Sequence, residues 1–265
     1  MKKFFIFITA LIIATTSCKK DDNEVIAEDT TPEGFTISSS DFGNVGDTFY
    51  MAKDISNLDL VLTTSADDIW DFSFLSEDEV DTIIYYNPSI FPAFSDFPNA
   101  NIAFDMNDGI AFAIKTTSMI EMIGFSISQS GSDVNIPLDD HLIINKFPFR
   151  KGSSFEDTGH GEITTSMNIG LPMNVDVKVV IDLTTISSIE EEAEMQLPGS
   201  SAKCLSENKV IISHIIATAM GSELLNQIDT AKSYNYYAAG KGTTFASVEL
   251  DSLGKVINVT YLKEM

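Results

Sequence analysis

An alternation of apolar and polar residues over positions 173–183 is the feature that most limits how this chain can fold. The odd positions from Met173 to Leu183 are all apolar, and the even positions are polar except for Val180. Because successive side chains of a β-strand point to opposite faces, a period of two places the apolar residues on one face. The segment is therefore predicted to be a half-buried strand.

Shorter strand-like runs follow one another along the rest of the chain. Asn107-Asp108-Gly109 separates two such runs, 104–106 and 110–114, and Asp-Gly tolerates the positive φ angles of a tight hairpin turn. A second hairpin is predicted from 243–250 and 255–261 around the loop 251–254. Three further apolar runs are candidate strands, and 210–216 is expected to be the more buried one: 83–86, 123–127 and 210–216.

Helical patterns are weak. The best candidate is 222–231, where Leu224, Leu225 and Ile228 have helical spacing, and a strand is an equal alternative there. Many short strands with turn residues between them are typical of an all-β fold. We expect antiparallel strands in a sandwich or a curved sheet, with at most one short helix outside the apolar N-terminal segment.

The charge balance excludes some classes of partner. The chain has 39 Asp and Glu residues against 16 Lys and Arg residues, which gives a formal net charge of −23. Affinity for nucleic acid depends on Lys and Arg placed against phosphates, so no nucleic-acid partner is expected. The same balance disfavours a purely electrostatic grip on anionic lipid.

The N-terminal residues have the layout of a secretion signal. Lys2 and Lys3 precede an apolar run over 4–14, which is too short to cross a bilayer. The small residues 15–17 then lead to Cys18. This arrangement resembles the lipobox of bacterial lipoproteins, and the resemblance implies cleavage before Cys18, lipidation of Cys18 and attachment to a membrane through that lipid.

Three parts of the chain are expected from this layout. Residues 1–17 are predicted to be a lipoprotein signal peptide, 18–33 the lipidated cysteine with a flexible acidic tether, and 34–265 a single β-rich domain. Lipidation of Cys18 would leave Cys204 as the remaining cysteine, so no disulfide within the chain is expected.

Several stretches resemble a group of uncharacterised secreted β-rich proteins of Bacteroidota. They are 46–49 with 70–75, then 194–199 with Cys204-Leu205, and finally 234–240 with parts of 248–262. The Lys-then-acidic run 19–24 is similar to the tag of surface-exported lipoproteins from these bacteria. The resemblance implies a lipid-anchored protein of the outer membrane, exposed at the cell surface, and no activity comes with it.

No catalytic, metal or cofactor motif is present in the sequence. His141, His160 and His214 are too far apart in sequence to form a paired metal motif. His160 is expected in a flexible turn, 157–162, whose carboxylates could hold a cation or simply face solvent. The chain contains no Gly-x-Ser-x-Gly elbow, P-loop or Gly-x-Gly-x-x-Gly. We therefore expect no catalytic residue, no metal, no cofactor and no enzymatic activity.

Trp70 and Phe72 are the candidate ligand-stacking residues. Their spacing of two places both rings on one strand face, together with Phe74. Such a face can stack on sugar rings, and it can equally belong to a core, because aromatic side chains bury large apolar areas. Both roles stay open at the level of the sequence.

The expected function is a non-enzymatic interaction or structural role in the cell envelope, with an unknown protein or glycan partner. The alternative is a ligand-binding module of an envelope uptake or transport system, for a glycan or an apolar cargo. An apolar-cargo carrier predicts an apolar cavity between the sheet and whatever covers it. A hydrolase that uses scattered carboxylates is a further alternative, whose residues cannot be located from sequence spacing.

Overall fold

The computed structural model describes residues 34–56, 58, 60, 62, 68–106, 109–129, 132–167 and 175–263. Within these ranges the long elements are all β-strands, and the helical elements are three short 3-10 helices, Ser39–Asp41, Pro88–Ile90 and Pro92–Asp96. The expectation of an all-β fold is confirmed. The described part of the chain contains no helix that is both long and apolar enough to cross a membrane.

The strands belong to one sheet. In chain order they are β1 (Thr48–Asp54), β2 (Ile69–Asp71), β3 (Glu79–Tyr86), β4 (Ile102–Met106), β5 (Gly109–Lys115), β6 (Met119–Gln129), β7 (Ser132–Lys146), β8 (Ser154–Met167), β9 (Val175–Leu197), β10 (Ser200–Ala219), β11 (Ser222–Ala238), β12 (Ala246–Leu250) and β13 (Val256–Leu262). Their order in the sheet is β10-β11-β12-β13-β1-β3-β4-β5-β6-β7-β8-β9-β2, and β10 also pairs with β9.

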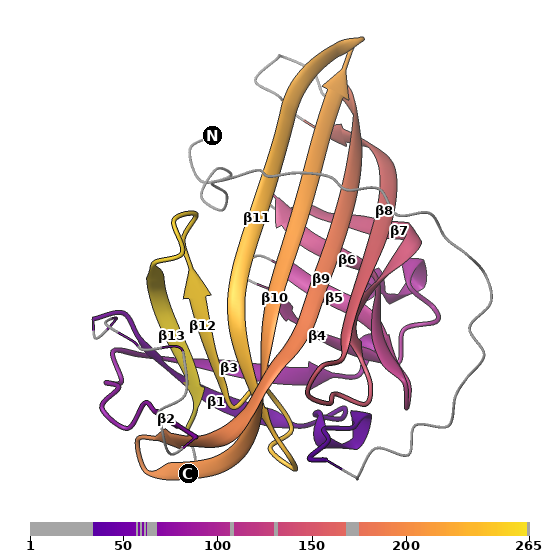
Figure 1. The fold of residues 1–265 in the computed structure, drawn as a ribbon. Coiled ribbons are helices and arrows are strands. Elements are labelled where there is room, and N and C mark those ends of the chain that lie inside the picture. Colours follow the sequence, from indigo (N-terminus) through magenta and orange to yellow (C-terminus); the bar gives the residue numbers. More distant parts are fainter. Residues whose placement is uncertain are drawn as a thin grey trace, which may run out of the picture.

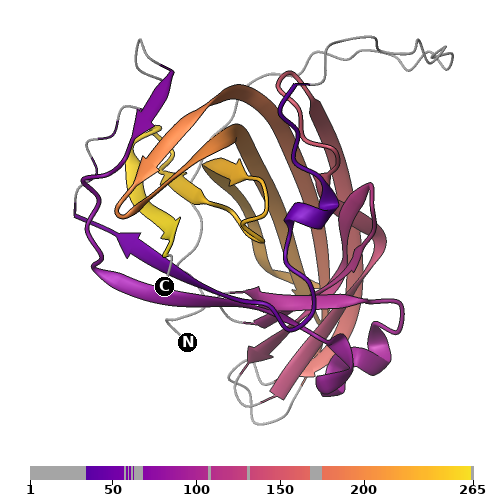
Figure 2. The same ribbon diagram turned by 90° about the horizontal axis from the view of Figure 1, so that it is seen from below.

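Twelve of the thirteen strands close into an antiparallel barrel (Figures 1 and 2). The pairing of β9 with β10 joins the two ends of the sheet order, and β2 lies outside the ring, parallel to β9. The expected sandwich or curved sheet is corrected by this closure. A sandwich would need two sheets face to face, whereas here one sheet supplies every wall and pairs with itself.

Strands β9 and β10 are the longest, at 23 and 20 residues, and Figure 1 shows them running the height of the molecule. Their register shifts between Ser206 and Glu207, so that Glu190 is an extra residue on β9. A bulge of this kind bends a strand and increases its twist. Because the alternation shifts by one residue, the β9 side chains after the bulge lie on the opposite face of the sheet from the one that their positions would otherwise give. Glu190–Glu192 therefore lie within a strand, despite their clustered charge.

Below the bulge in Figure 1 the long strands curl over β1, β12 and β13 and enclose a packed core, which we call the base. The buried side chains of the base are Met51, Ala52, Trp70, Phe72, Leu75, Ala193, Met195, Leu197, Cys204, Tyr236, Ala238, Phe245, Ala246, Val248, Val256, Val259, Tyr261 and Leu262. They come from β1, β2 and β9–β13, together with the loops beside them. The base is thus a core between two layers of strands.

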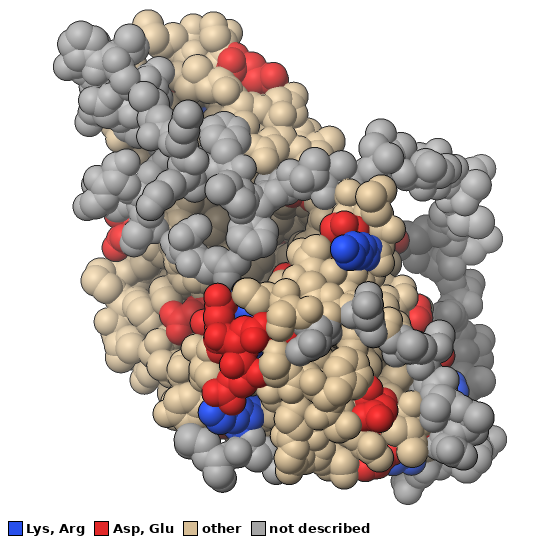
Figure 3. All heavy atoms as spheres, turned by 90° about the vertical axis from the view of Figure 1, so that its left-hand side faces the viewer, with Lys and Arg blue, Asp and Glu red and all other residues tan. Residues whose placement is uncertain are grey.

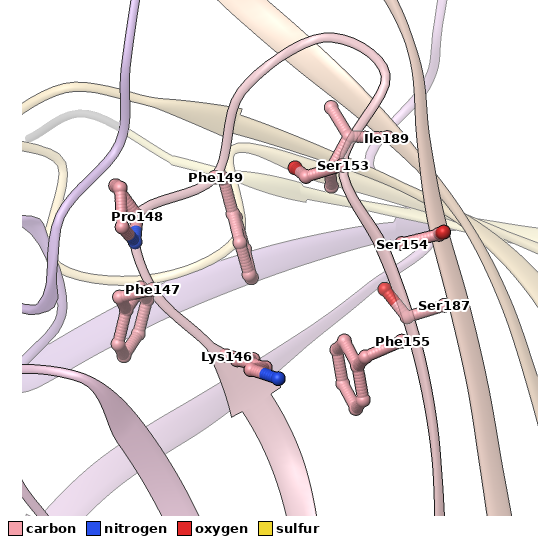
Figure 4. Close-up of a pocket in the computed structure, with 9 residues that line it drawn as sticks. All are labelled: Lys146, Phe147, Pro148, Phe149, Ser153, Ser154, Phe155, Ser187 and Ile189. Carbon is pink, nitrogen blue, oxygen red and sulfur yellow. The ribbon is translucent and has the colours of Figure 1, made fainter. Parts of the chain in front are cut away.

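A second cluster, rich in aromatic residues, closes the lower end of the barrel interior, and we call it the floor. Phe42 lies at the centre of the floor. The centroid of its ring is 4.9 Å from the ring centroid of Phe147, 5.9 Å from that of Phe149 and 5.3 Å from that of Tyr237. Phe147 and Phe149 flank Pro148 in the connection from β7 to β8 (Figure 4). Edge-to-face and tilted contacts of this kind add to the apolar area that the rings bury.

Strand β8 contains two glycines that let β7 cross it closely. A Cβ atom at position 161 would lie 2.6 Å from the carbonyl oxygen of Pro137, which is closer than real Cβ contacts. Glycine in a strand often marks such an approach of two backbones. His160, between Gly159 and Gly161, therefore belongs to a strand. The prediction of a flexible turn at 157–162 is wrong.

The other strand predictions are mostly confirmed. Both hairpins form, as β4–β5 and as β12–β13. The alternating segment is β9 from Val175 onward, and the runs 83–86, 123–127 and 210–216 lie in β3, β6 and β10. Of the two alternatives for 222–231, the strand is the one that forms, as the first part of β11.

Candidate ligand-binding cavity

The barrel interior contains a partly open cavity of about 870 Å³ above the floor. Strands β3 to β11 supply its wall, and most of the wall side chains are apolar. Small-molecule sites are usually clefts of roughly 300–1,000 Å³ with a mainly apolar lining and a few polar groups. The apolar wall residues are Phe42, Ile83, Tyr85, Ile102, Phe104, Met106, Ile120, Met122, Phe125, Ile127, Val134, Ile136, Leu142, Ile144, Ile163, Val177, Val179, Ile181, Leu183, Ile211, Ile215, Ala217, Leu225 and Tyr237.

The alternating pattern of β9 builds one side of this cavity. Its odd residues from Val177 to Leu183 point inward and line the cavity. On β10, Ile215 is paired with Ile181, and Ala217 with Val179, so the odd residues of β10 continue the same wall. The apolar face that the sequence predicted therefore contacts a hollow interior rather than a packed core.

The wall is one strand thick, so its outer face meets solvent directly. Residues 210–216 of β10 are half-buried, although a more buried strand was expected. Ile211 and Ile215 line the cavity, whereas Ile212 and Ile216, at even positions, belong to the outer face. The run therefore has apolar side chains on both faces, one toward the cavity and one on the half-buried outer surface, which is why it lacks alternation.

At its lower end the cavity is lined by a buried lysine. The Nζ atom of Lys209 donates to the carbonyl oxygen of Ile144 at 2.6 Å and to Oδ1 of Asn145 at 2.9 Å. It also lies 3.6 Å from Oε1 of Glu207, an ion pair in which the glutamate side chain is fully buried. Buried charges are tolerated when they are paired and hydrogen-bonded, and Lys209 combines two hydrogen bonds with an ion pair.

Glu207 is the centre of a buried hydrogen-bond network. One carboxylate oxygen accepts from the hydroxyl of Ser187 at 2.6 Å, and the other from Nδ2 of Asn235 at 3.0 Å and the hydroxyl of Tyr237 at 2.8 Å. Burial, together with the neighbouring Glu207 charge, raises the pKa of Tyr237 well above its ordinary value. The tyrosine therefore stays protonated and donates. A fully satisfied network of this kind rigidifies the end of the cavity.

A second, smaller pocket lies in the connection between β7 and β8 (Figure 4). Its volume is about 140 Å³, and it is lined by Phe147, Phe149, Phe155 and Ile189 among others. This volume is well below the usual range for small-molecule sites. Of the two, the barrel cavity is the candidate site.

Trp70 and Phe72 do not contribute to the cavity. Both are 1% exposed and lie in the base, with their rings 5.0 Å and 5.7 Å from the ring of Tyr236. Stacking on a ligand needs an exposed ring face, and neither residue presents one. Phe74, the third aromatic residue of this stretch, is 52% exposed and does not share their face.

The three histidines lie apart from one another. Nδ1 of His160 is 2.7 Å from Oδ1 of Asp182 on the neighbouring strand β9, and this hydrogen bond raises the pKa of His160. Nδ1 of His141 lies 3.5 Å from Oε2 of Glu121. Within the described ranges, no group of three or more His, Cys, Asp or Glu side chains could hold a metal ion.

The structure describes one of the two cysteines. Cys18, the predicted lipidation site, lies outside the described residues. Cys204 is buried in the base, and burial raises the pKa of its thiol. A thiol that stays protonated is a poor nucleophile, so Cys204 acts as a small apolar side chain.

Sequence reasoning did not find the polar groups inside the barrel. Glu207, Lys209 and Ser213 sit at odd positions of β10, the face that also carries Leu205 and Ile211. A charged residue at an inward position of an apolar strand is the sequence pattern that could have indicated them. Reading it required the register of β10, which depends on the bulge.

Comparisons with known proteins add little. No protein-family model matches the chain, and no curated protein matches it. A candidate lipoprotein of Parabacteroides distasonis has a TM-score of 0.32 at 6% identity, covering 86% of this chain and 98% of its own. A candidate exported protein of Bacteroides fragilis with a YmcC-like fold has a TM-score of 0.28 at 8% identity, covering 83% and 96%. At these TM-scores neither similarity supports a statement about the fold or function of this chain.

Proposed function

We propose that this protein binds an apolar or amphipathic small molecule inside its barrel while a lipid on Cys18 holds it at the cell envelope. The cavity of about 870 Å³ with its mainly apolar wall carries the proposal. Of the functions considered from the sequence, the apolar-cargo carrier is the one that requires such a cavity. The structural role and the glycan-binding module do not require it.

The apolar wall would supply most of the binding free energy. Transfer of apolar surface out of water stabilises a complex by about 25 cal/mol for each Å² that is buried. A long-chain ligand in this cavity would bury its own surface and that of side chains such as Ile181, Ile211 and Ile215. The role is binding rather than catalysis, and it uses no metal and no cofactor.

The location at the envelope is supported by the sequence before residue 34. The lipobox-like ending at Cys18 and the Lys-then-acidic run after it favour a lipid anchor and exposure at the surface of the outer membrane. The face drawn in Figure 3 shows more acidic than basic side chains, in line with the net charge of −23. Such a surface repels nucleic acid and anionic lipid, so a neutral, apolar cargo is the partner that suits this protein.

Two neighbouring isoleucines provide a direct test of binding. Ile215 lines the cavity, and Ile216 faces outward on the same strand. The mature chain with Cys18→Ala is titrated with Nile red, an apolar dye that brightens in apolar surroundings. We expect Ile215→Trp to fill part of the cavity and to weaken dye binding roughly tenfold or more, which corresponds to about 1.4 kcal/mol. Ile216→Trp is the matched control and should bind as the wild type does.

Equal dye binding by the two variants would contradict the proposal, because the dye would then sit on the surface. The same holds if the wild type does not bind Nile red at all. Circular dichroism and unfolding curves of both variants check that neither tryptophan has disrupted the barrel.

The anchor is tested separately, in cells. A palmitate analogue should label the wild-type protein and fail to label Cys18→Ala, and a protease added to intact cells should remove the wild-type protein. Labelling that does not depend on Cys18 would contradict the anchor. Protection until the outer membrane is broken would contradict surface exposure while leaving the anchor in place.

A further inference from the structure

One polar side chain in the upper part of the barrel lacks a good hydrogen-bond partner. Asp229 on β11 is 5% exposed, and its Oδ1 atom has no hydrogen-bond partner among the described residues. Its other oxygen lies 3.5 Å from Nε2 of Gln227, which is a long and weak contact. A buried carboxyl group without donors is unfavourable, so its presence here calls for an explanation.

The strand register directs this carboxyl group toward the cavity. Asp229 is paired with Ser213 of β10, and Ser213 lines the cavity. Leu225 and Ser233, four residues before and after Asp229 on the same face of β11, line the cavity as well. Asp229 and Ser213 therefore lie side by side on the inward faces of β11 and β10, with Ile215 above and Ile211 below on β10, and Ser213 is the one of the two that lines the cavity.

The lower end of the cavity differs from the surroundings of Asp229 in one respect. Lys209 donates two hydrogen bonds and forms an ion pair with Glu207, and Glu207 accepts hydrogen bonds from three side chains, so the buried pair has partners without a ligand. Asp229 has no such set of partners. Burial raises its pKa above the ordinary value of 3.8, as expected for a carboxyl group that lacks donors to stabilise its charged form.

We propose that Asp229 and Ser213 form a polar anchor that holds an amphipathic ligand through a hydrogen-bond donor, a hydroxyl or an amine, on its apolar body. The inference rests on the proposed function, since it names the class of ligand that the same cavity takes. The donor of the ligand supplies the hydrogen bond that Oδ1 of Asp229 lacks, and its chain extends along the apolar wall. The hydroxyl of Ser213 offers a second contact to the same head group.

A ligand with a carboxylate head suits this cavity poorly. Its charge would face the acceptor oxygens of Asp229, and Lys209 already directs its donors at Ile144, Asn145 and Glu207. The cavity is therefore selective for long-chain alcohols or amines over fatty acids of the same length.

The test uses the mature chain with Cys18→Ala and three twelve-carbon competitors, each below its solubility limit and, for the two charged ones, below its critical micelle concentration. Dodecanol, dodecylamine and dodecanoate share one chain and differ in the head group. Each displaces bound Nile red, and the concentrations for half displacement are compared. The alcohol or the amine should act at a concentration roughly tenfold lower than dodecanoate, the size expected for one hydrogen bond to a buried carboxyl group.

Two variants test whether Asp229 causes the preference for the alcohol or the amine over dodecanoate. Asp229→Leu should abolish it while keeping Nile red binding, and Thr230→Leu, the outward-facing neighbour on β11, should leave it unchanged. Asp229→Asn has nearly the same size and serves if the leucine variant does not fold. It keeps an acceptor oxygen without the charge, so a preference for the alcohol should survive in it and a preference for the amine should be lost.

The outcomes separate this inference from the proposed function. Equal displacement by the three competitors, or strongest displacement by dodecanoate, overturns the polar anchor while the apolar-binding function stands. A preference that persists in Asp229→Leu overturns it as well. A wild-type protein that does not bind Nile red removes the proposed function, and the anchor with it.

Discussion

The base and the cavity are bounded by the same long strands, yet only the base is packed. In the base, Met195, Cys204 and Tyr236 of β9–β11 are fully buried against neighbouring side chains. Higher in the barrel the same strands carry Ile181 and Ile215 against a cavity of about 870 Å³. An alternating pattern thus assigns a strand an apolar face without deciding what that face contacts.

The number of strands explains the difference. Barrel diameter grows with the number of strands, and about eight strands give an interior that side chains can fill. A ring of twelve strands is wider, so its opposite walls do not meet above the floor. In the base, the bulge at Glu190 lets β9 and β10 curl onto β12, β13 and β1, and two close layers of strands exclude the space.

The largest stability effect is expected in the base. Trp70→Ala should lower the free energy of unfolding by about 3–5 kcal/mol, because it leaves a cavity in a packed core. Urea unfolding measures the change. Phe74→Ala is the control from the same segment, since Phe74 is 52% exposed, and it should cost less than about 1 kcal/mol. A small loss in Trp70→Ala would mean that the base is not a rigid core.

The second-largest effect on stability is expected in the buried hydrogen-bond network around Glu207, between the base and the cavity. Glu207→Gln removes the charge that balances Lys209 at 3.6 Å, and breaking a buried ion pair typically costs about 3 kcal/mol or more. Glu162→Gln is the matched control, because Glu162 forms an exposed ion pair with Lys178 at 2.7 Å. It should cost at most about 1 kcal/mol. Equal effects in urea unfolding would show that the network is not a stabilising junction.

The cavity wall should tolerate truncation better than the base does. Ile215→Ala should cost about 1 kcal/mol, since the removed atoms face a cavity and few contacts are lost. Leu197→Ala, in the base at 3% exposure, should cost about 2–5 kcal/mol. Thermal or urea unfolding of the two variants gives the comparison. A loss of similar size in both would contradict a hollow upper barrel.

The smallest effect concerns pH at the outer surface. The hydrogen bond to Asp182 raises the pKa of His160 above its ordinary value of 6.5, so the protonated pair stabilises the folded state. This contribution is complete below pH 6.5 and is lost as the pH rises through the higher pKa of the folded state. The melting temperature should therefore decline slightly over that interval in the wild type. His160→Gln should show no such decline, and parallel pH profiles would exclude the contribution.

The sequence predicted the local structure well because local structure follows from local patterns. Asp108-Gly109 and the loop 251–254 placed both hairpins, and the alternation before Leu183 placed an inward and an outward face on β9. The candidate site was predicted less well. Trp70 and Phe72 are compatible with a stacking face or a core by their spacing, and only their contacts with Tyr236 assign them to the base.

One failure shows the limit of local patterns. His160 was expected in a turn, because glycines are typical of turns. In the structure the glycines beside His160 let β7 approach β8, and Glu190 forms a bulge in a long strand. Both roles depend on a neighbouring strand that is distant in sequence, so no local pattern can reveal them.

By itself, the sequence determined that the chain is all-β, which faces of its strands are apolar and where its hairpins turn. Only the tertiary structure decided that the sheet closes on itself, that its apolar faces line a cavity, and that Lys209 lines this cavity while Glu207 and Asp229 are buried on the same inward faces of their strands. The physical reason is that side-chain alternation is a property of one strand. Closure, strand number and register are properties of the whole ring, set by pairings between residues far apart in the chain.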